Sequence, residues 1–593
     1  MNHQHLAEFL GAAAAQHPDR IATRVRVGDG WRTQTFSEFA AKARRVASGL
    51  ISAGIEAGDR VALFAANCPE WSEIDFGCVL ARAVSVPLYS TSSPEQIRHI
   101  LSDSGSKMIV VGAQSEAERV LEVADDLPDL GSIVIIEPYE GMPDRFVPLS
   151  EFGTDDDADV DARTAGASGD ELLTLIYTSG TTGDPKGVML THQGMLSQVD
   201  SVQELFEVTP DDHSLCFLPL SHAFERAWTY LVLGNGCMNT YVANARTVAD
   251  QMVWAQPTLM VSVPRLYEMV FKTAHAKVAS SALKRAIFTW AFRVGGRLQR
   301  AYRKGKTPSA FWRAQLPLAE ALVFKNIRAA MGGQKKVLAC GGAPLRQEIE
   351  EFFSAAGLLI CQGYGLTEAS PLVSFNSPGG FKFGTTGRIM PGGQVRIGEH
   401  GEILYRGPNV MAGYWNNPEA TAQTIRDGWL HTGDAGYVDT DGYLVITDRI
   451  KDIIITSGGK NVAPQPIEGL VLADPLFEHA VLLGDNRPCL TLLVRPSFPA
   501  LEELAARMQW PGGLSEWLEH PDFIREVKRR VAELTAKLPS HEQVRETHVL
   551  ADEFTMDNGL LTPTLKVKRR EVEKRFRDAV EAMYQRIADR RKE

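Results

Sequence analysis

Several features are missing from this sequence, and each absence excludes a class of protein. Its seven cysteines form no Cys-x-x-Cys pair and no zinc-binding spacing, so neither a dithiol redox motif nor a structural zinc site is predicted. No apolar run approaches the roughly 18 residues that a membrane-spanning helix needs. Basic residues are in deficit, with 62 Lys and Arg against 73 Asp and Glu, which argues against a general nucleic-acid binder.

The start of the chain also lacks the marks of a secretory signal, because residues 1–20 have no basic n-region and include Glu8. The scattered cysteines are typical of reduced, mostly buried thiols in a cytosolic protein. We therefore expect a cytoplasmic protein. Peripheral contact at the inner membrane face and a homodimer are left open. With 593 residues the chain is too long for one ordinary domain, so two or more are expected.

The most informative stretch is residues 177–187, with the sequence YTSGTTGDPKG. It follows an apolar, β-prone run and precedes a segment that could open a helix at Thr191. Glycines let backbone amides approach phosphates, hydroxyls can bind oxygen or Mg²⁺, and the lysine adds positive charge. A Walker A loop is excluded, because Pro185 replaces its second glycine and Gly187 its Ser or Thr. A plain surface turn is the simpler interpretation of such a cluster, but this ordered combination favours a phosphate loop.

Four later segments have residues suited to a nucleotide. They are FLPLSHAF (217–224), ACGGAPL (339–345), QGYGLTE (362–368) and HTGD (431–434). Each could be structural alone, and a lone histidine such as His222 is more often a structural residue. Together they can describe one site: Tyr364 can stack on adenine beside the glycine pair, and Asp434 can accept both ribose hydroxyls. Glu368, with Thr181, can hold the Mg²⁺ that neutralises the phosphates.

In this order the segments resemble the adenylation motifs of the AMP-forming acyl- and aryl-CoA synthetase superfamily, over nearly the whole chain. Residues 448–453, DRIKDI, resemble the linker on which that family's C-terminal domain rotates. Residues 561–569, LTPTLKVKR, resemble the C-terminal lysine motif of the long-chain fatty acyl-CoA synthetases. The match carries the catalytic lysine over to Lys566, with Lys568 as a nearby rival.

The resemblance implies that a fatty acid carboxylate attacks the α-phosphate of Mg·ATP, and that the acyl-AMP formed then passes its acyl group to CoA. The expected cofactors and substrates are Mg²⁺, ATP, CoA and a long-chain fatty acid. The alternative is a fatty acyl-AMP ligase, or another acid–CoA ligase that passes the acyl group to a carrier protein or a different acceptor. Residues 384–448 contain no extra block, which favours CoA ligation. A non-catalytic nucleotide-binding relative would be expected to have lost Lys566, Glu368 or Lys186, and all three are present.

The resemblance assigns roles residue by residue. The catalytic candidates are Lys566, Glu368, His222 and Lys186. The ATP- and AMP-binding candidates are Thr178, Ser179, Gly180, Thr181, Thr182, Gly183, Lys186, Gly341, Gly342, Gln362, Gly363, Tyr364, Gly365, Thr367, Asp434, Arg449 and Lys566. The metal candidates are Thr181 and Glu368, and the hinge candidates are Asp448 and Lys451. An apolar acyl tunnel is expected near Phe224, Trp228, Leu231, Val261 and the end of residues 362–375, where plain hydrophobic core is the competing interpretation.

The predicted fold is α/β, with a large N-terminal domain of β/α layers and a small β-barrel-like subdomain, and a smaller, mobile α+β C-terminal domain. The expected boundaries are 1–447 for the adenylation domain, 448–453 for the hinge and 454–593 for the C-terminal domain. Residues 275–333 are predicted to be a helical insertion, either an amphipathic hairpin packed on the body or a lipid-facing flap.

Two further segments are predicted to be exposed to solvent. Residues 155–170, rich in Asp, Ala and Gly, are expected to form an exposed connection. Residues 566–593, with mixed charges at helical spacing, are expected to form a solvated terminal helix.

Overall fold

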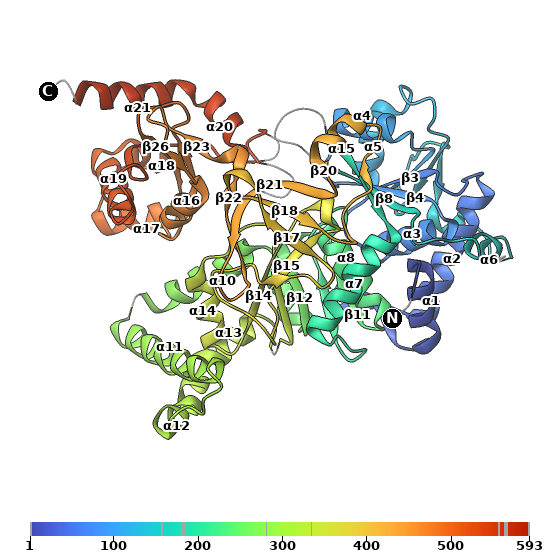
Figure 1. The fold of residues 1–593 in the computed structure, drawn as a ribbon, viewed down its shortest axis with the longest axis horizontal. Coiled ribbons are helices and arrows are strands. Elements are labelled where there is room, and N and C mark those ends of the chain that lie inside the picture. The colour runs from blue at the N-terminus through green and yellow to red at the C-terminus, as the bar shows by residue number, and fades with distance from the viewer. Residues whose placement is uncertain are drawn as a thin grey trace. The chain divides into compact units, whose positions relative to one another are not determined.

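The computed structural model describes residues 3–155, 158–178, 185–279, 281–333, 335–555, 558–561 and 567–590. The chain divides into two compact units (Figure 1). The first comprises Met1–Arg396, Leu404–Thr432 and Val438–Val445, and the second Ile397–Ile403, Gly433–Tyr437 and Ile446–Glu593. Helices and strands occur in both, which confirms the α/β class with a large N-terminal and a smaller C-terminal part.

One sheet of the first unit has eight strands, in the order β19-β9-β8-β4-β3-β5-β6-β7. Neighbouring strands are parallel from β8 to β7, whereas β9 is antiparallel to both β8 and β19. Strands and crossover helices alternate along the chain from residue 60, as the predicted β/α layers require. The elements are β3 (Arg60–Phe64), α3 (Pro69–Ala81), β4 (Val84–Leu88), α4 (Pro94–Ser104), β5 (Met108–Val111), α5 (Gln114–Ala124), β6 (Ser132–Ile135), β7 (Phe146–Pro148), β8 (Leu172–Thr178), β9 (Lys186–Thr191) and β19 (Gly413–Tyr414).

The other large sheet of this unit has nine strands, in the order β16-β15-β14-β13-β12-β10-β11-β1-β2. Its middle, from β14 to β1, is parallel, and antiparallel strands close both ends. The strands are β1 (Ile21–Val27), β2 (Gly30–Thr35), β10 (His213–Cys216), β11 (Met238–Tyr241), β12 (Leu259–Ser262), β13 (Val337–Cys340), β14 (Ile360–Gly365), β15 (Leu372–Phe375) and β16 (Arg388–Ile389).

Two helices, α3 and α8 (Ala223–Gly234), lie between the two sheets. Helix α3 contacts β3 and β4 of one sheet and β1 of the other, and nearly all its residues are buried on every side. Helix α8 packs on β10 and β11, while its Arg226 bonds Ser85 of β4 and Thr174 of β8. A helix buried all round belongs to the interior of a large domain. The two sheets and these helices therefore share one layered core.

A charged pair is buried between these helices. The side chains of Asp75 on α3 and Arg226 on α8 are 2% and 1% exposed. Arg226 Nε donates to Asp75 Oδ2 at 3.1 Å, and the Tyr230 hydroxyl donates to the same oxygen at 2.6 Å. Arg226 Nη1 donates to Thr174 Oγ1 at 2.7 Å and Nη2 to Ser85 Oγ at 2.5 Å. These bonds offset the cost of removing both charges from water.

The helical insertion forms a hairpin packed on the body of the first unit. The prediction of helix over residues 275–333 is confirmed, although the helical segment begins earlier, at Pro264. Helix α11 packs on α14, and Gly295 allows this approach, because a Cβ there would lie 2.2 Å from the Ala355 carbonyl oxygen. The helices are α10 (Pro264–Ala279), α11 (Ala282–Arg303), α12 (Ala310–Ala319), the π-helix η3 (Glu320–Phe324), α13 (Lys325–Ala330) and α14 (Gln347–Ala355).

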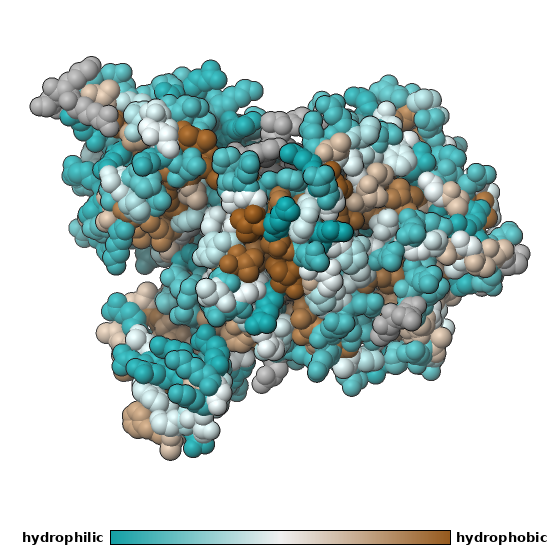
Figure 2. Space-filling view, in the orientation of Figure 1, coloured by the Kyte–Doolittle hydropathy of each residue, from teal (hydrophilic) through white to brown (hydrophobic). Residues whose placement is uncertain are grey.

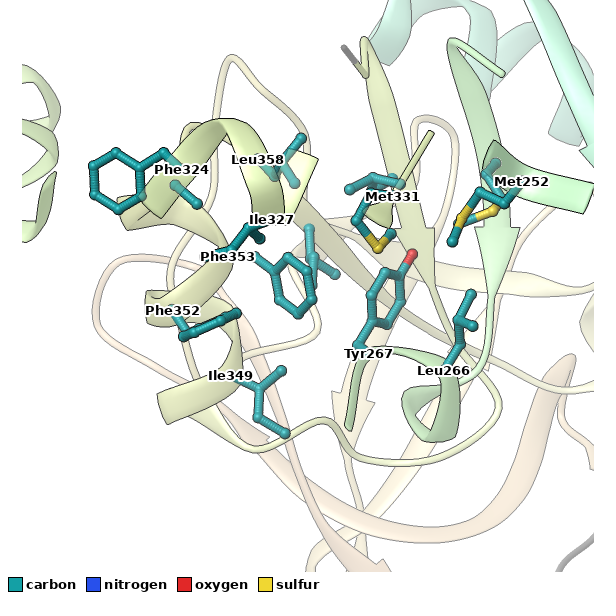
Figure 3. Packing of buried hydrophobic residues seen from close by; sticks show 14 of the residues in the cluster. Met252, Leu266, Tyr267, Phe324, Ile327, Met331, Ile349, Phe352, Phe353 and Leu358 are labelled. Carbon is teal, nitrogen blue, oxygen red and sulfur yellow. The ribbon is translucent and has the colours of Figure 1, made fainter. Parts of the chain in front are cut away.

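Aromatic side chains fill the core beneath this insertion (Figure 3). The rings of Tyr267 and Phe353 meet edge to face, with centroids 5.6 Å apart. Phe352 stacks on Phe292 of α11 at 4.5 Å. The buried Tyr267 hydroxyl donates to the Ala339 carbonyl oxygen at 3.0 Å, so this polar group is satisfied. The insertion is thus anchored through packed rings.

Residues 155–170 correct one prediction, because they are not only an exposed connection. Helix α6 (Ala158–Thr164) lies there and packs on α2 (Phe36–Ser52) and α3. Val160 is fully buried, and Thr164 Oγ1 donates to the Leu80 carbonyl oxygen at 3.1 Å. A seven-residue helix presents too few apolar positions for its buried face to stand out in the sequence.

Residues 384–449 are rich in strands, which agrees with the expected small β subdomain. They contain a five-stranded sheet in which β17, β18, β21 and β20 are neighbours in that order and β22 pairs with β21. The elements are β17 (Gln394–Ile397), β18 (Glu402–Arg406), α15 (Pro418–Thr424), β20 (Ile425–Arg426), β21 (Trp429–Val438) and β22 (Leu444–Arg449).

The second unit has its own α+β core around a three-stranded sheet, β25-β26-β27. Strands β25 and β26 pair antiparallel, and β27 pairs with β26 in parallel. The predicted solvated terminal helix is instead two helices, α20 and α21, and α21 buries Val580 and Met583. The elements are β23 (Ile454–Ile455), β24 (Asn461–Val462), α16 (Pro464–Leu472), β25 (Phe477–Leu483), β26 (Leu490–Pro496), α17 (Phe498–Met508), α18 (Leu514–Glu519), α19 (Pro521–Thr535), β27 (Val544–Val549), α20 (Arg569–Arg575) and α21 (Arg577–Arg590).

Across the described residues, no helix has both the length and the apolar character needed to cross a membrane. All seven cysteines carry free thiols, and five of them are buried, which agrees with the interpretation of mostly buried small side chains.

Candidate active site

Three of the predicted site segments follow parallel strands in the middle of the nine-stranded sheet, where β13 and β14 are neighbours and β12 separates β13 from β10. His222 lies after β10, the glycine pair 341–342 directly after β13, and Glu368 after β14. Because the carboxyl ends of parallel strands meet at one edge of a sheet, these segments share an edge where ligands commonly bind in α/β proteins.

Glycines at this edge allow close approach of backbone segments. A Cβ on Gly365 would lie 1.8 Å from the Pro371 carbonyl oxygen, and one on Gly363 would lie 2.7 Å from the Phe375 ring. Gly342 adopts a φ of +81°, a conformation that favours glycine. At Gly341 a Cβ would lie 3.2 Å from the Phe224 ring, so this glycine brings the backbone against α8. An alanine at Gly363 or Gly365 would clash, one at Gly342 would be strained by its φ, and one at Gly341 would require the Phe224 ring to shift.

Gln362 has protein partners at both ends of its buried amide. Its Oε1 accepts from the Leu345 amide at 2.7 Å, and its Nε2 donates to the Thr385 carbonyl oxygen at 3.3 Å. It therefore holds the loop that follows the glycine pair. Tyr364 and Thr367 lie nearby, Tyr364 half-buried on β14 and Thr367 buried at the start of a short 3₁₀ helix, η4 (Thr367–Ala369). Contact of any of these with a nucleotide stays a prediction.

The predicted phosphate loop connects two antiparallel strands. Thr178, at the end of β8, pairs with Lys186, at the start of β9. This strand–loop–strand arrangement separates the loop further from a Walker A loop, which leads from a strand into a helix. Ser179, Gly180, Thr181, Thr182 and Gly183 lie outside the described residues.

The base of this loop is fixed by two contacts. The Tyr177 hydroxyl donates to Asp103 Oδ2 at 2.6 Å, and burial together with that carboxylate raises the pKa of Tyr177. His99 Nε2 lies 2.9 Å from the Pro185 carbonyl oxygen. The two ends of the loop are therefore held by side chains of α4.

Tyr414 brings two of the catalytic candidates together. Its hydroxyl donates to Glu368 Oε1 at 2.9 Å, and Lys186 Nζ lies 5.4 Å from the centre of its ring. Burial and the neighbouring carboxylate raise the pKa of Tyr414, so the hydroxyl keeps its proton and donates. Strand β19 sets this geometry, because Tyr414 pairs with Val188, two residues after Lys186. Tyr414 is not among the residues predicted from the sequence, because its segment, RGPNVMAGYW (406–415), carries no motif that marks it as part of a site.

Glu368 also fits the metal role assigned to it. Among the described residues, no three His, Cys, Asp or Glu side chains gather to hold a metal ion by themselves. A Mg²⁺ that accompanies nucleotide phosphates needs only one or two protein carboxylates, because phosphates and water supply the other ligands. The half-buried Glu368 carboxylate, oriented by Tyr414, meets that requirement. Thr181, its expected partner, lies outside the described residues.

His222 caps the first turn of α8. Its Nδ1 accepts from the Phe224 amide at 3.2 Å, so in the neutral ring the proton is on Nε2. Behind it, the fully buried Glu225 accepts from the Leu218 amide at 3.1 Å and so holds the loop that leads to His222. Burial raises the pKa of Glu225 to about 8, so this carboxyl is mostly protonated at neutral pH. Glu225 is not among the residues predicted from the sequence, because a glutamate in a helix gives no sign in the sequence of whether it faces the interior or the solvent.

An apolar pocket lies between α7 (His192–Phe206), α8 and the segment around β15. Its cavity is about 20 Å³, room for one water molecule, so the side chains nearly close it. The predicted lining residues Phe224, Trp228 and Leu231 all border it, whereas Val261 does not. The full lining is Gln198, Val199, Val202, Phe224, Ala227, Trp228, Leu231, Pro371, Leu372 and Phe375.

Within the second unit, two predicted nucleotide residues form an ion pair. Arg449 Nε lies 3.1 Å from Asp434 Oδ1. Asp434 is 7% exposed, whereas Arg449 is 48% exposed. The pair lies on the adjacent strands β21 and β22. Lys566 and the side chain of Lys451 lie outside the described part of the chain.

The hinge candidate Asp448 is buried, at 3% exposure. Its Oδ1 accepts from the Arg449 amide at 2.6 Å, while Oδ2 has no hydrogen-bond partner among the described residues. Burial raises the pKa of Asp448 to about 6. The ionised form is therefore costly in the folded protein.

This burial predicts a pH-dependent stability that Asp448→Asn removes. Well below pH 4 the carboxyl is protonated in both the folded and the unfolded chain, so it does not lower the free energy of unfolding. Between about pH 4 and pH 6 it ionises in the unfolded chain but stays protonated in the folded protein, which lowers the free energy of unfolding by up to about 3 kcal/mol, and above about pH 6 this loss is complete. In urea titrations at about pH 4 and about pH 8, the variant should unfold at higher urea than the native protein only at the higher pH. The exposed Glu503→Gln is the control, and an equal shift at both pH values would contradict the prediction.

Comparison with known proteins places the chain among adenylating enzymes. A family model described as AMP-binding enzyme matches residues 10–415, and one described as AMP-binding enzyme C-terminal domain matches residues 451–588. The chain is 36% identical to the long-chain-fatty-acid–CoA ligase FadD15 of Mycobacterium bovis, over 98% of this chain and 97% of that protein. It is 30% identical to the long-chain-fatty-acid–CoA ligase ACSBG1 of Mus musculus, over 94% of this chain and 82% of that protein.

Solved structures share the fold at lower identity. A crystal structure of the anthranilate CoA ligase AuaEII with anthranoyl-AMP covers 97% of this chain and 98% of its own, at a TM-score of 0.72 and 19% identity. The adenylation domain of a carboxylate reductase from Mycobacterium chelonae covers 99% of this chain and 92% of its own, at a TM-score of 0.78 and 22% identity. These likenesses establish the fold that positions the residues described above.

Proposed function

Because the chain belongs to the AMP-binding enzyme family, we propose that it is an AMP-forming long-chain fatty acid–CoA ligase. It would join a fatty acid to AMP with release of pyrophosphate, and then transfer the acyl group to CoA with release of AMP. The single observation that supports the acyl assignment is the position of the Phe224 side chain. It lines the apolar pocket and also lies against Gly341 of the predicted nucleotide edge.

The residues have separate tasks in this reaction. The loop from Thr178 to Lys186 would hold the β- and γ-phosphates, and the Lys186 ammonium would offset their charge. Glu368 would hold Mg²⁺, which supplies positive charge to the phosphates as the carboxylate approaches the α-phosphorus. Asp434 and Arg449 would bind the ribose side of the nucleotide. His222, with the proton of its neutral ring on Nε2, would lie between the acyl and nucleotide sites.

The experiment that tests this function measures pyrophosphate release over fatty acids of graded chain length, with and without CoA. We expect release that depends on a long-chain acid, and formation of acyl-CoA and AMP when CoA is added. A protein that releases pyrophosphate but forms no thioester with CoA would be the alternative acyl-AMP ligase. No fatty-acid-dependent release at any chain length would reject both.

Tyr414→Phe should weaken the use of Mg·ATP without changing the fold. Loss of the hydroxyl leaves Glu368 free to rotate, and a hydrogen bond to a charged, partly exposed group corresponds to about a five- to tenfold effect. The Mg²⁺ concentration that gives half-maximal pyrophosphate release should rise by that factor. Tyr302→Phe, an exposed tyrosine on α11, is the matched control. An unchanged Mg²⁺ dependence would contradict the role of Tyr414.

Ala227→Phe should shorten the acyl chain that the enzyme accepts. The added ring fills the pocket between α7 and α8, and each methylene excluded from apolar contact loses about 0.8 kcal/mol. Exclusion of three methylenes would lower kcat/KM for a long-chain acid by about fiftyfold. Activity with a short acid reports that the variant is folded, and the exposed Ala506→Phe is the control. An equal loss for short and long acids would argue against this pocket as the acyl site.

We also propose a cytoplasmic enzyme that works in peripheral contact with a membrane. A long-chain acid and its CoA ester both partition into lipid, so a ligase at the bilayer surface meets its substrate at high local concentration. Cell fractionation tests this proposal: the enzyme should appear in both the soluble and the salt-washed membrane fractions.

A further inference from the structure

The helical insertion carries a charge opposite to that of the whole chain. Between residues 272 and 328 the sequence has thirteen Lys or Arg and one acidic residue, Glu320. The whole chain has a net charge of −11. Figure 1 shows α11 and α12 beyond α13 and α14 at the edge of the first unit, and Figure 2 shows this region as largely teal, with white to tan over α12. We call helices α11, α12 and η3 the tip.

Helix α12 and η3 expose an apolar face to solvent. Phe311, Leu318 and Leu322 are 68%, 56% and 47% exposed. They recur at helical spacing, so they share one side of the helix. The smaller exposed residues on the same side are Ala310, Ala314, Pro317 and Ala321. A surface helix normally turns charged or polar residues outwards, so an exposed apolar face of this kind indicates a surface that binds a partner.

Helix α11 exposes a basic row beside it. Arg293, Arg297, Arg300 and Lys304 are exposed and recur at helical spacing on one side of the helix. None of the ion pairs among the described residues uses these four side chains. Their charges are therefore available to an anionic partner. Arg297 also lies 5.9 Å from the centre of the Trp312 ring, which brings the basic row close to α12.

The tip is rigid enough to present both features together. Trp290 Nε1 of α11 donates to Gln315 Oε1 of α12 at 2.7 Å. The close approach of Gly295 to Ala355 fastens α11 to α14. The apolar and basic residues thus stand on one supported hairpin.

We propose that the tip docks on an anionic phospholipid bilayer, with Phe311, Leu318 and Leu322 inserted at the level of the headgroups and the α11 row on lipid phosphates. Apolar anchors beside basic residues are the combination that holds an amphipathic helix at a charged interface. A tip-to-tip contact with a second copy of this chain fits less well, because it would bring the same excess of positive charge against the row. The proposal assigns the surface by which the proposed ligase would make its peripheral contact, and it can be tested without substrates.

The experiment measures co-sedimentation of the full chain with vesicles. One set contains phosphatidylglycerol in phosphatidylcholine, and the other is pure phosphatidylcholine. The apolar variant is Phe311→Ser with Leu318→Ser and Leu322→Ser, and the basic variant is Arg293→Gln with Arg300→Gln and Lys304→Gln. The matched control is Arg507→Gln with Met508→Ser, an exposed basic–apolar pair on α17.

The native protein should bind the anionic vesicles, and salt should release it. Each tip variant should lower the partition coefficient by about tenfold or more, since each basic residue near an anionic surface contributes about a fivefold effect. The control should bind like the native protein. Three results would overturn the proposal: equal binding to neutral vesicles, native-like binding by both tip variants, or loss of a native dimer in sedimentation velocity in the apolar variant. Vesicle binding and pyrophosphate release are separate readouts, so failure of one is distinguishable from failure of the other.

Discussion

Replacing Lys566 with alanine should abolish acyl-AMP formation and leave thioester formation from supplied acyl-AMP largely intact. The expectation rests on the resemblance of residues 561–569 to the C-terminal lysine motif of the long-chain synthetases, since Lys566 itself lies outside the described residues. The physical reason is charge. A carboxylate that approaches the α-phosphorus meets anionic oxygens, and a lysine between them stabilises the transition state of this step alone.

The two half-reactions are measured separately. Fatty-acid-dependent exchange of pyrophosphate into ATP reports the first, and acyl-CoA formation from added acyl-AMP reports the second. Loss of one preorganised charged group costs about 10²- to 10³-fold. We expect a loss of that size in the first half-reaction and less than about threefold in the second.

Lys568→Ala is the matched control for this prediction. Lys568 is exposed two residues further on, and its amide donates to the Leu560 carbonyl oxygen at 2.9 Å. Its removal should leave both half-reactions nearly unchanged. If Lys568→Ala abolished adenylation and Lys566→Ala did not, the two lysines would have to exchange roles. If both half-reactions fell equally in Lys566→Ala, a single position of this lysine would serve both steps and the rotation of the C-terminal domain would be wrong.

Asp75→Ala should destabilise the first unit by about 3–5 kcal/mol, because it leaves the Arg226 charge buried without its partner. The guanidinium would keep its bonds to Ser85 and Thr174, but no anion would offset its desolvation. Urea titration followed by tryptophan fluorescence should show a correspondingly lower midpoint, with the second unit little changed.

The double variant Asp75→Ala with Arg226→Met separates the buried charge from the lost contacts. Removing both charges should recover most of the stability, since apolar replacement of a buried pair is often close to neutral. The surface pair of Arg44 and Asp161 is the control: Asp161 is 73% exposed, so Asp161→Ala should cost less than about 1 kcal/mol. A double variant as unstable as Asp75→Ala would show that lost packing contacts, and not the unpaired charge of Arg226, explain the loss of stability.

Local sequence patterns were sufficient for much of the fold and for the family. The ends of helix α4 are marked in the sequence itself, because Ser93, Pro94 and Gly105 set them through local backbone chemistry. The motifs of the nucleotide site were equally visible, since glycines, hydroxyls and charges in a fixed order do not depend on the rest of the chain. The short helix α6 and the parallel strand β27 were missed, because neither has enough residues for a distinct period.

The sequence by itself therefore determined the α/β class, the family and the identity of most candidate site residues. Only the tertiary structure decided which distant side chains meet. Tyr414 reaches Glu368 across 46 residues, and Arg226 reaches Asp75 across 151, and both contacts depend on strand order and helix packing. The tip shows the same division: its positive charge can be counted from the sequence, but only the structure shows that its apolar face is turned towards solvent. A residue's type is local, whereas its partners are set by how layers pack, and that is a property of the whole chain.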